Sequence, residues 1–256
     1  RAVEVGAERV VEDSSGNAGA AIATYSARAG LPATIYVPAD AKASKLRAIR
    51  RADADVVRVK GDREDVTAAC LDAVEAERGW YASHAWNPAF FAGTATMAYE
   101  IAHQHGWSAP DAVVMPLGHG TMFLGAYRGF EALFDAGWID RIPKLLGAQA
   151  AGYAPVASAL HGDRATDEND IADGIQIRDP VQRDAILDAV AESGGDVIAL
   201  PERAVTTALD RLHGSGFYTE PTSAIAPAAL EAYRDRGVIE SGDDVVVPLS
   251  GSGLKG

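Results

Sequence analysis

The sequence has one cysteine, few lysines and no long apolar run, and each shortage excludes a class of protein. Cys70 has no second cysteine to pair with, so a disulfide-stabilised secreted fold is excluded and a reducing cytoplasm is the expected location. No stretch approaches 18 consecutive apolar residues, so neither a membrane-spanning helix nor a membrane partner is expected. The net charge of −13 disfavours nucleic acid as a partner, because phosphate binding needs clustered lysine and arginine.

What the chain does contain is typical of a globular protein. Hydrophobic residues make up 48% and charged residues 23% of its 256 positions, which argues against disorder. The length fits one large domain or two small ones. The histidines show no spacing typical of metal ligands, so no metal site is expected. A ligand site is therefore expected among the loops that join the regular elements.

Short apolar runs alternate with longer segments rich in helix-forming residues. The expected strands are Arg9–Glu12, Ala33–Val37, Val56–Val59, Ala112–Met115, Lys144–Ala148, Val197–Leu200 and Val245–Pro248. The expected helices are Ala18–Ala29, Ala43–Arg51, Glu64–Arg78, Thr94–Gln104, Met122–Ala136, Val181–Glu192, Glu202–Leu212 and Ser223–Arg236. This alternation predicts an α/β fold of parallel βαβ units.

Three segments depart from this regular alternation. Gly106 and Pro110 interrupt it, which predicts a smaller domain over residues 1–105 and a larger one over residues 106–256. The polar stretch His161–Arg178 predicts a long loop. Arg1–Ala7 has the composition of the last part of a helix, so we expect preceding residues.

Three glycine-rich loops follow expected strands: Asp13–Gly19, Pro116–Gly125 and Leu249–Lys255. In a parallel α/β sheet, ligands bind beyond the carboxyl ends of the strands. The first two loops also open helices, where free N–H groups favour anions. Neither has the spacing of a dinucleotide or Walker A loop. Three such loops predict a site that holds a small anionic ligand from several sides.

Motifs along the whole chain resemble a known family in their order and spacing. They are Ser14–Asn17 (SSGN), Lys42–Leu46 followed by DADVVRVKGD, Gly93–Ile101 (GTATMAYEI), Gly118–Thr121 (GHGT), Ile175–Pro180 (IQIRDP), Glu220–Ala224 (EPTSA) and Ser250–Lys255 (SGSGLK). The family is the tryptophan synthase β-subunit superfamily of pyridoxal-phosphate (PLP) enzymes, fold type II, and within it threonine synthase. The resemblance implies two domains, each a mainly parallel sheet flanked by helices, with the cofactor in the cleft between them.

The resemblance also implies roles for individual residues. The cofactor would be held by Asn17 at its 3′ oxygen, by Gly118, His119, Gly120 and Thr121 at its phosphate, and by Ser250 at its pyridine nitrogen. The substrate would be held by Ser14, Ser15, Gly16 and Gln176. Two segments depart from the family pattern. The phosphate loop reads GHGT instead of a glycine run, and Gln176 and Asp179 replace an arginine and an asparagine.

The implied activity is that of a homodimeric PLP-dependent lyase that converts O-phosphohomoserine and water to threonine and phosphate. Threonine or serine dehydratase, cysteine synthase and cysteate synthase remain alternatives, as does a non-catalytic protein that binds PLP or an amino acid. The family also attaches PLP to a lysine as a Schiff base. None of the five lysines, Lys42, Lys45, Lys60, Lys144 and Lys255, matches that position, so we expect this lysine upstream of Arg1.

Overall fold

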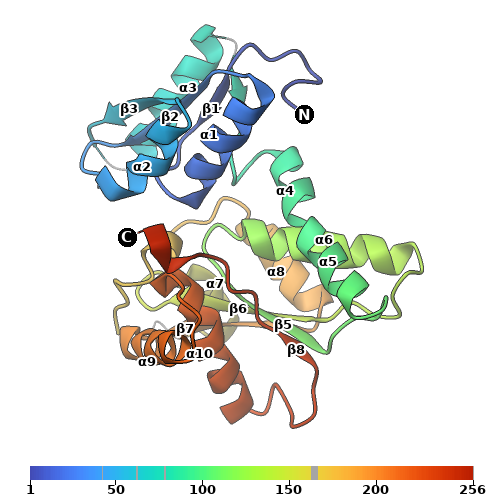
Figure 1. Cartoon of the computed structure of the whole chain (residues 1–256). Coiled ribbons are helices and arrows are strands. Elements are labelled where there is room, and N and C mark those ends of the chain that lie inside the picture. The colour runs from blue at the N-terminus through green and yellow to red at the C-terminus, as the bar shows by residue number, and fades with distance from the viewer. Residues whose placement is uncertain (42, 62, 78, 163–166, 256) are drawn as a thin grey trace. The chain divides into compact units, whose positions relative to one another are not determined.

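The computed structural model describes residues 1–41, 43–61, 63–77, 79–162 and 167–255 (Figure 1). These residues form two compact units, which are described separately. Unit 1 comprises Arg1–Phe90 and Lys255, and unit 2 comprises Phe91–Leu254. Each unit contains a four-stranded sheet whose paired strands are all parallel. The α/β fold with two parallel sheets flanked by helices is therefore confirmed.

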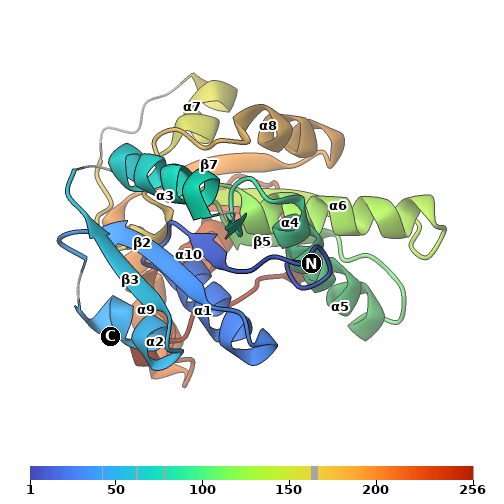
Figure 2. The same cartoon turned by 90° about the horizontal axis from the view of Figure 1, so that it is seen from above.

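Unit 1 is a sheet of order β3-β2-β1-β4. Its strands are β1 (Val10–Glu12), β2 (Ala33–Pro38), β3 (Asp55–Val59) and β4 (Trp80–Tyr81), and its helices are α1 (Asn17–Ala29), α2 (Ala43–Arg51) and α3 (Arg63–Glu77). Helices α1 and α2 pack together on one face of the sheet, and α3 lies on the other (Figure 2). Ile35 and Val37 of β2 are fully buried together with Ala23, Leu46 and Ile49, so these apolar side chains hold α1 and α2 on the sheet.

Unit 2 is a sheet of order β7-β6-β5-β8. Its strands are β5 (Ala112–Pro116), β6 (Lys144–Ala150), β7 (Asp196–Leu200) and β8 (Val245–Val246). The remaining elements are α4 (Pro88–Thr94, which begins in unit 1), α5 (Thr96–Gln104), α6 (Thr121–Asp135), α7 (Pro155–His161), η1 (Asp173–Ile175), α8 (Arg183–Glu192), α9 (Glu202–Gly214), α10 (Pro221–Asp235) and η2 (Gly253–Lys255, which ends in unit 1).

Two cores cover the two faces of this second sheet. Val113 and Met115 of β5 pack into a core shared with α5, α6 and α8, whereas Ala112 and Val114 pack into a core shared with α9 and α10. Successive residues of a strand point to opposite faces, so both faces of the sheet are buried. This burial explains why the strands of unit 2 are apolar at consecutive positions.

The division between the units lies between Phe90 and Phe91, before the boundary between residues 105 and 106 that the sequence predicted. The reason is the packing of α5, whose apolar side chains contribute to the first core of unit 2. Gly129 of α6 allows this close approach, because a Cβ there would lie 2.7 Å from the Cβ of Ala98. Gly106 therefore ends a helix within unit 2, and Pro110 lies between that helix and β5.

The segment Arg1–Ala7, which was expected to be the last part of a helix, forms a single hydrogen-bonded turn and no regular helix. The N–H of Ala7 bonds the oxygen of Ala2 at 3.0 Å, and the N–H of Gly6 bonds the oxygen of Val3 at 3.1 Å. Gly6 has a φ of +69°. This is the Schellman arrangement, in which a residue with positive φ ends a helical turn.

Some predicted segments fall partly outside the described residues. They include Lys42 and Asp62 of the motifs and residues 163–166 of the long loop. The described remainder of that loop is irregular apart from His161, which ends the helix over Pro155–His161, and from η1. No helix among the described residues is long and apolar enough to cross a membrane.

Candidate functional site

The loop between β5 and α6 is shaped by two glycines that no other residue could replace without displacement. A Cβ on Gly118 would lie 3.2 Å from the Cα of Ile175, and a Cβ on Gly120 would lie 2.7 Å from the Cγ1 of Ile186. Gly120 also has a φ of +80°, which side-chain-bearing residues rarely adopt. The N–H of Leu117 bonds the oxygen of Ala148 at 2.8 Å and fixes the start of the loop to β6.

This loop opens α6, a helix of 15 residues whose N-cap is Gly120. The first N–H groups of a helix have no partner within it, and the helix dipole adds positive potential there. The hydroxyl of Thr94 donates to the oxygen of Thr121 at 3.0 Å and so holds the first turn against α4. His119 and Thr121 are half-buried beside these N–H groups. The arrangement suits a phosphate or another small anion.

Contacts within unit 2 connect this loop to the chain's last segments. Ile175 contacts Gly118, and its neighbour Gly174 donates its N–H to the hydroxyl of Thr222 at 3.1 Å. From the start of α10, the N–H of Glu220 bonds the oxygen of Gly251 at 3.0 Å. The loops after β5 and β8 therefore belong to one connected cluster at the carboxyl edge of the sheet.

Two predicted site residues of this cluster have different surroundings. Ser250 follows β8 and is exposed. Gln176 is half-buried, and its amide donates to the oxygen of Asn169 at 3.2 Å and to Asp170 Oδ1 at 3.3 Å. The Gln176 amide is thus bonded within its own loop and carries no positive charge.

Buried hydroxyl groups near the start of α10 were missed by sequence reasoning. The side-chain oxygens of Thr219 and Ser223 are buried and have no hydrogen-bond partner among the described residues. Buried polar atoms are normally satisfied, and leaving one without a partner costs about 1–3 kcal/mol. These two hydroxyls are therefore unsatisfied polar groups buried beside the start of α10.

The other predicted site residues lie in unit 1: Ser14, Ser15 and Gly16 join β1 to α1, and Asn17 is the first residue of α1. The N–H of Gly16 bonds the hydroxyl of Ser14 at 3.2 Å, and Gly16 is the N-cap of α1 without a side-chain cap. A Cβ on Gly19 would overlap the carbonyl of Ser14, so the loop folds tightly onto the first turn of the helix. Gly16 and Asn17 are exposed, and the two serines are half-buried.

A buried carboxylate anchors the start of this loop. Asp13 is 2% exposed and accepts hydrogen bonds from Arg63 Nη2 at 3.0 Å, Thr67 Oγ1 at 2.7 Å and the Tyr81 hydroxyl at 3.1 Å. Arg63 also donates to its carbonyl oxygen. The end of β1 is therefore tied to α3 and β4.

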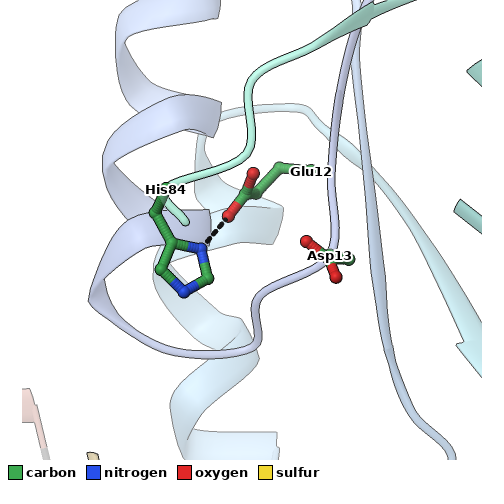
Figure 3. A group of neighbouring side chains, drawn as sticks. All are labelled: Glu12, Asp13 and His84. Atoms are coloured by element: carbon green, nitrogen blue, oxygen red, sulfur yellow. Dashed lines mark hydrogen bonds and ion pairs between the residues drawn. The ribbon is translucent and has the colours of Figure 1, made fainter. Parts of the chain in front are cut away.

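Glu12, the preceding residue, is fully buried and pairs with His84, a contact that the sequence analysis did not predict. Its Oε1 lies 2.7 Å from Nδ1 of His84 (Figure 3). Burial raises the pKa of the Glu12 carboxyl, and the hydrogen bond with His84 opposes that rise. The pairing could not be predicted, because 72 residues separate the two.

Glu12, Asp13 and His84 offer ligand atoms within 4.8 Å of one another, which is the geometry of a possible metal site. No metal was expected from the sequence. Both oxygens of Asp13 already accept hydrogen bonds, one of them from the cationic Arg63. The cluster is therefore a hydrogen-bonded network. His84 pairs with Glu12, whereas Asp13 accepts hydrogen bonds from other residues.

The structure describes the side chains of two of the five lysines, Lys60 and Lys144. Lys144 is the first residue of β6 and lies at the amino ends of the strands, whereas Gly118 follows the carboxyl end of β5. Its Nζ lies 3.5 Å from the oxygen of Val238. Lys60 is exposed and follows β3 in unit 1. Lys144 therefore does not lie in the cluster formed by the loops after β5 and β8.

Comparisons with known proteins identify the family of the chain. Residues 1–251 match the family described as pyridoxal-phosphate dependent enzyme. Threonine synthase of Methanocaldococcus jannaschii is 34% identical over 266 residues, which cover 100% of this chain and 64% of that protein. Threonine synthase of Mycobacterium tuberculosis H37Rv is 29% identical over 256 residues, covering 98% and 69%. The chain spans 64% of the length of the archaeal relative.

Solved structures show the same fold. Maize serine racemase matches with a TM-score of 0.82 and 23% identity, over 98% of this chain and 75% of that one. Threonine deaminase isoform 2 of Solanum lycopersicum matches with a TM-score of 0.80 and 22% identity, over 97% and 67%.

Proposed function

Because this chain belongs to the family of pyridoxal-phosphate dependent enzymes, we propose that the loop Gly118–Thr121 holds the phosphate of that cofactor. The observation that carries the proposal is the pair of glycines pressed against Ile175 and Ile186 at the start of α6. Their lack of Cβ atoms lets the loop backbone pack directly against these two residues, and the helix start that follows supplies N–H donors and positive potential. The residues present therefore fit a phosphate.

From the resemblance to this family we also assign Ser250 to the pyridine nitrogen and Asn17 to the 3′ oxygen of the cofactor. Ser14, Ser15 and Gly16 bind the carboxylate of the amino acid, for which the start of α1 provides N–H groups.

The cofactor, when bound, supplies the electron sink for reactions at an amino acid's carbon atoms. The protein orients it and sets its charge. A neutral hydroxyl at Ser250 does not stabilise a proton on the pyridine nitrogen as a carboxylate would. This environment favours elimination and replacement of a leaving group over transamination.

We propose the reaction of threonine synthase, in which O-phosphohomoserine and water give threonine and phosphate. The support is the relatives named threonine synthase at 29–34% identity over nearly the whole chain. A dehydratase is the second candidate. One observation favours it, since the amide of Gln176 bonds Asn169 and Asp170 and provides no cation for a substrate phosphate.

Cofactor binding is tested by titrating the protein with PLP and following its visible absorbance. Borohydride reduction and peptide mapping then identify the lysine that carries the cofactor. We expect neither Lys60 nor Lys144, and a label on Lys144 would contradict the proposed site.

Product analysis separates the two reactions. O-phosphohomoserine should give threonine and phosphate in equal amounts. Ammonia and a 2-oxo acid formed from threonine would instead identify a dehydratase. The homodimer stays a prediction, which light scattering on the purified protein tests.

A further inference from the structure

The loop that contains Ser250 pairs with the chain segment in front of α10. The N–H of Glu220 bonds the oxygen of Gly251 at 3.0 Å, and the N–H of Gly253 bonds the oxygen of Tyr218 at 3.0 Å. A single antiparallel bridge lies between these two bonds. All of these residues belong to unit 2. A ribbon of two such short segments is marginally stable by itself, so its position depends on the side chains that pack on it.

Two glycines of this loop leave room for side chains of the opposite segment. A Cβ on Gly251 would lie 2.7 Å from the Cγ of Glu220 and would overlap its carboxylate. A Cβ on Gly253 would lie 2.8 Å from the Cε1 of Tyr218. Neither of these two described glycines has a positive φ, so the backbone conformation does not require glycine at either position. The space does, because the side chains of Glu220 and Tyr218 lie directly on the backbone of the loop.

The segment in front of α10 is itself attached to the body of unit 2. The ring centroids of Tyr218 and His213 lie 4.7 Å apart, and Nε2 of His213 lies 3.0 Å from the oxygen of Thr219. His213 belongs to α9, and Glu220 is the N-cap residue of α10. These two helices pack against each other and contribute to the second core of unit 2. The supporting segment is therefore fixed by two packed helices, and the exposed Ser250 is placed through it.

We propose that Glu220 is a positioning residue that places Ser250 for its contact with the cofactor. This inference rests on the proposed function, which assigns Ser250 to the pyridine nitrogen. Glu220 acts through Gly251, because its side chain packs on the backbone of Gly251 and its N–H bonds the oxygen of the same residue. Adjacent Cα atoms are held about 3.8 Å apart, so a shift of Gly251 moves Ser250 with it. A misplacement of about 1 Å is enough to impair a site.

Hydrogen exchange tests this support without any cofactor. The N–H of Gly253 is the probe, because its bond to the oxygen of Tyr218 closes the ribbon. In Glu220→Ala the loop loses the side chain that packs on it, and this N–H should exchange about 10-fold faster than in the unmodified protein. Glu220→Gln keeps the size and shape of the side chain and should restore most of the protection. Equal exchange in Glu220→Ala and the unmodified protein would overturn the proposal.

Titration with PLP tests whether the support serves the cofactor. Glu220→Ala should bind PLP about 10-fold more weakly, with an almost unchanged free energy of unfolding. Gly251→Ala should weaken binding to the same extent, because the added methyl group displaces the mobile end of the Glu220 side chain. The double variant should bind PLP no more weakly than either single variant, since both changes disrupt one contact.

Gly214→Ala is the matched control. Gly214 ends α9, and nothing lies within 4 Å of a Cβ there, so PLP affinity should stay unchanged. Unchanged affinity in Glu220→Ala, or losses that add in the double variant, would overturn the role of Glu220 while leaving the proposed function intact. If the unmodified protein binds no PLP, the proposed function itself is refuted, and the role of Glu220 with it.

Discussion

Gly120 lies against Ile186, so that a Cβ at Gly120 would come within 2.7 Å of the Cγ1 of that side chain. The contact fixes where the loop after β5 turns into α6. Two reasons favour glycine at this position: its φ is +80°, and a Cβ would overlap Ile186.

Gly120→Ala should therefore weaken PLP binding and lower the free energy of unfolding by about 2 kcal/mol, from strain and overlap together. PLP titration and urea unfolding measure the two effects. Gly137→Ala is the matched control. Its φ is +72° and nothing lies within 4 Å of a Cβ there, so it should destabilise without weakening PLP binding. Equal PLP affinity in all three proteins would contradict the assignment of the phosphate loop.

Thr222→Val should loosen the connection between η1 and α10, because it removes the acceptor of the Gly174 N–H. The expected loss is about 1 kcal/mol in the free energy of unfolding, the usual net value of one hydrogen bond. Thr222→Ser keeps the hydroxyl and should recover most of that loss. If Thr222→Val unfolds with the same free energy as the unmodified protein, the hydrogen bond does not contribute to stability.

Asp13→Ala should be more damaging, at about 2–3 kcal/mol, because Arg63, Thr67 and Tyr81 lose their common acceptor. The control is Asp55→Ala. Asp55 also pairs with an arginine, Arg9 at 3.2 Å, but its side chain is 72% exposed. Exposed pairs contribute less than about 1 kcal/mol. Chemical denaturation that ranks the two variants equally would disprove the anchoring role of Asp13.

The stability of the protein should depend on pH through Glu12. Burial raises the pKa of Glu12 above the ordinary value of 4.5, so the folded state favours the protonated acid. The resulting stabilisation is complete below pH 4.5 and is lost as the pH rises through the folded-state pKa. Glu12→Gln does not titrate at this position. As the pH rises from 4 to 8, the free energy of unfolding of Glu12→Gln should therefore increase relative to that of the unmodified protein. If the difference between the two free energies does not change with pH, the raised pKa of Glu12 is contradicted.

Local sequence signals were sufficient to predict a helix or strand where the composition of the segment itself determines its structure. The helix Ala43–Arg51 was predicted with the bounds that the structure shows, and every expected strand is present. In contrast, α7 was missed because its start is capped from elsewhere. Gln149 of β6 accepts hydrogen bonds from the N–H groups of Val156 and Ala157, both at 3.0 Å. The two-residue strand β4 is likewise defined by its pairing with β1.

The candidate site shows the same limit. Its glycine loops were visible in the sequence because helix starts and glycine have local signatures. The side chains that press on those loops, Ile175 and Ile186, lie far along the chain, and so does His84 from Glu12. Such contacts depend on tertiary packing, which one sequence does not encode in any local pattern.

The most direct test of a carbon–oxygen lyase is to supply O-phosphohomoserine to the PLP-loaded protein in water labelled with oxygen-18. The account predicts threonine that carries one labelled oxygen and phosphate that carries none, because the C–O bond breaks and water supplies the new hydroxyl. Labelled phosphate together with homoserine would show cleavage of the P–O bond and would contradict the account.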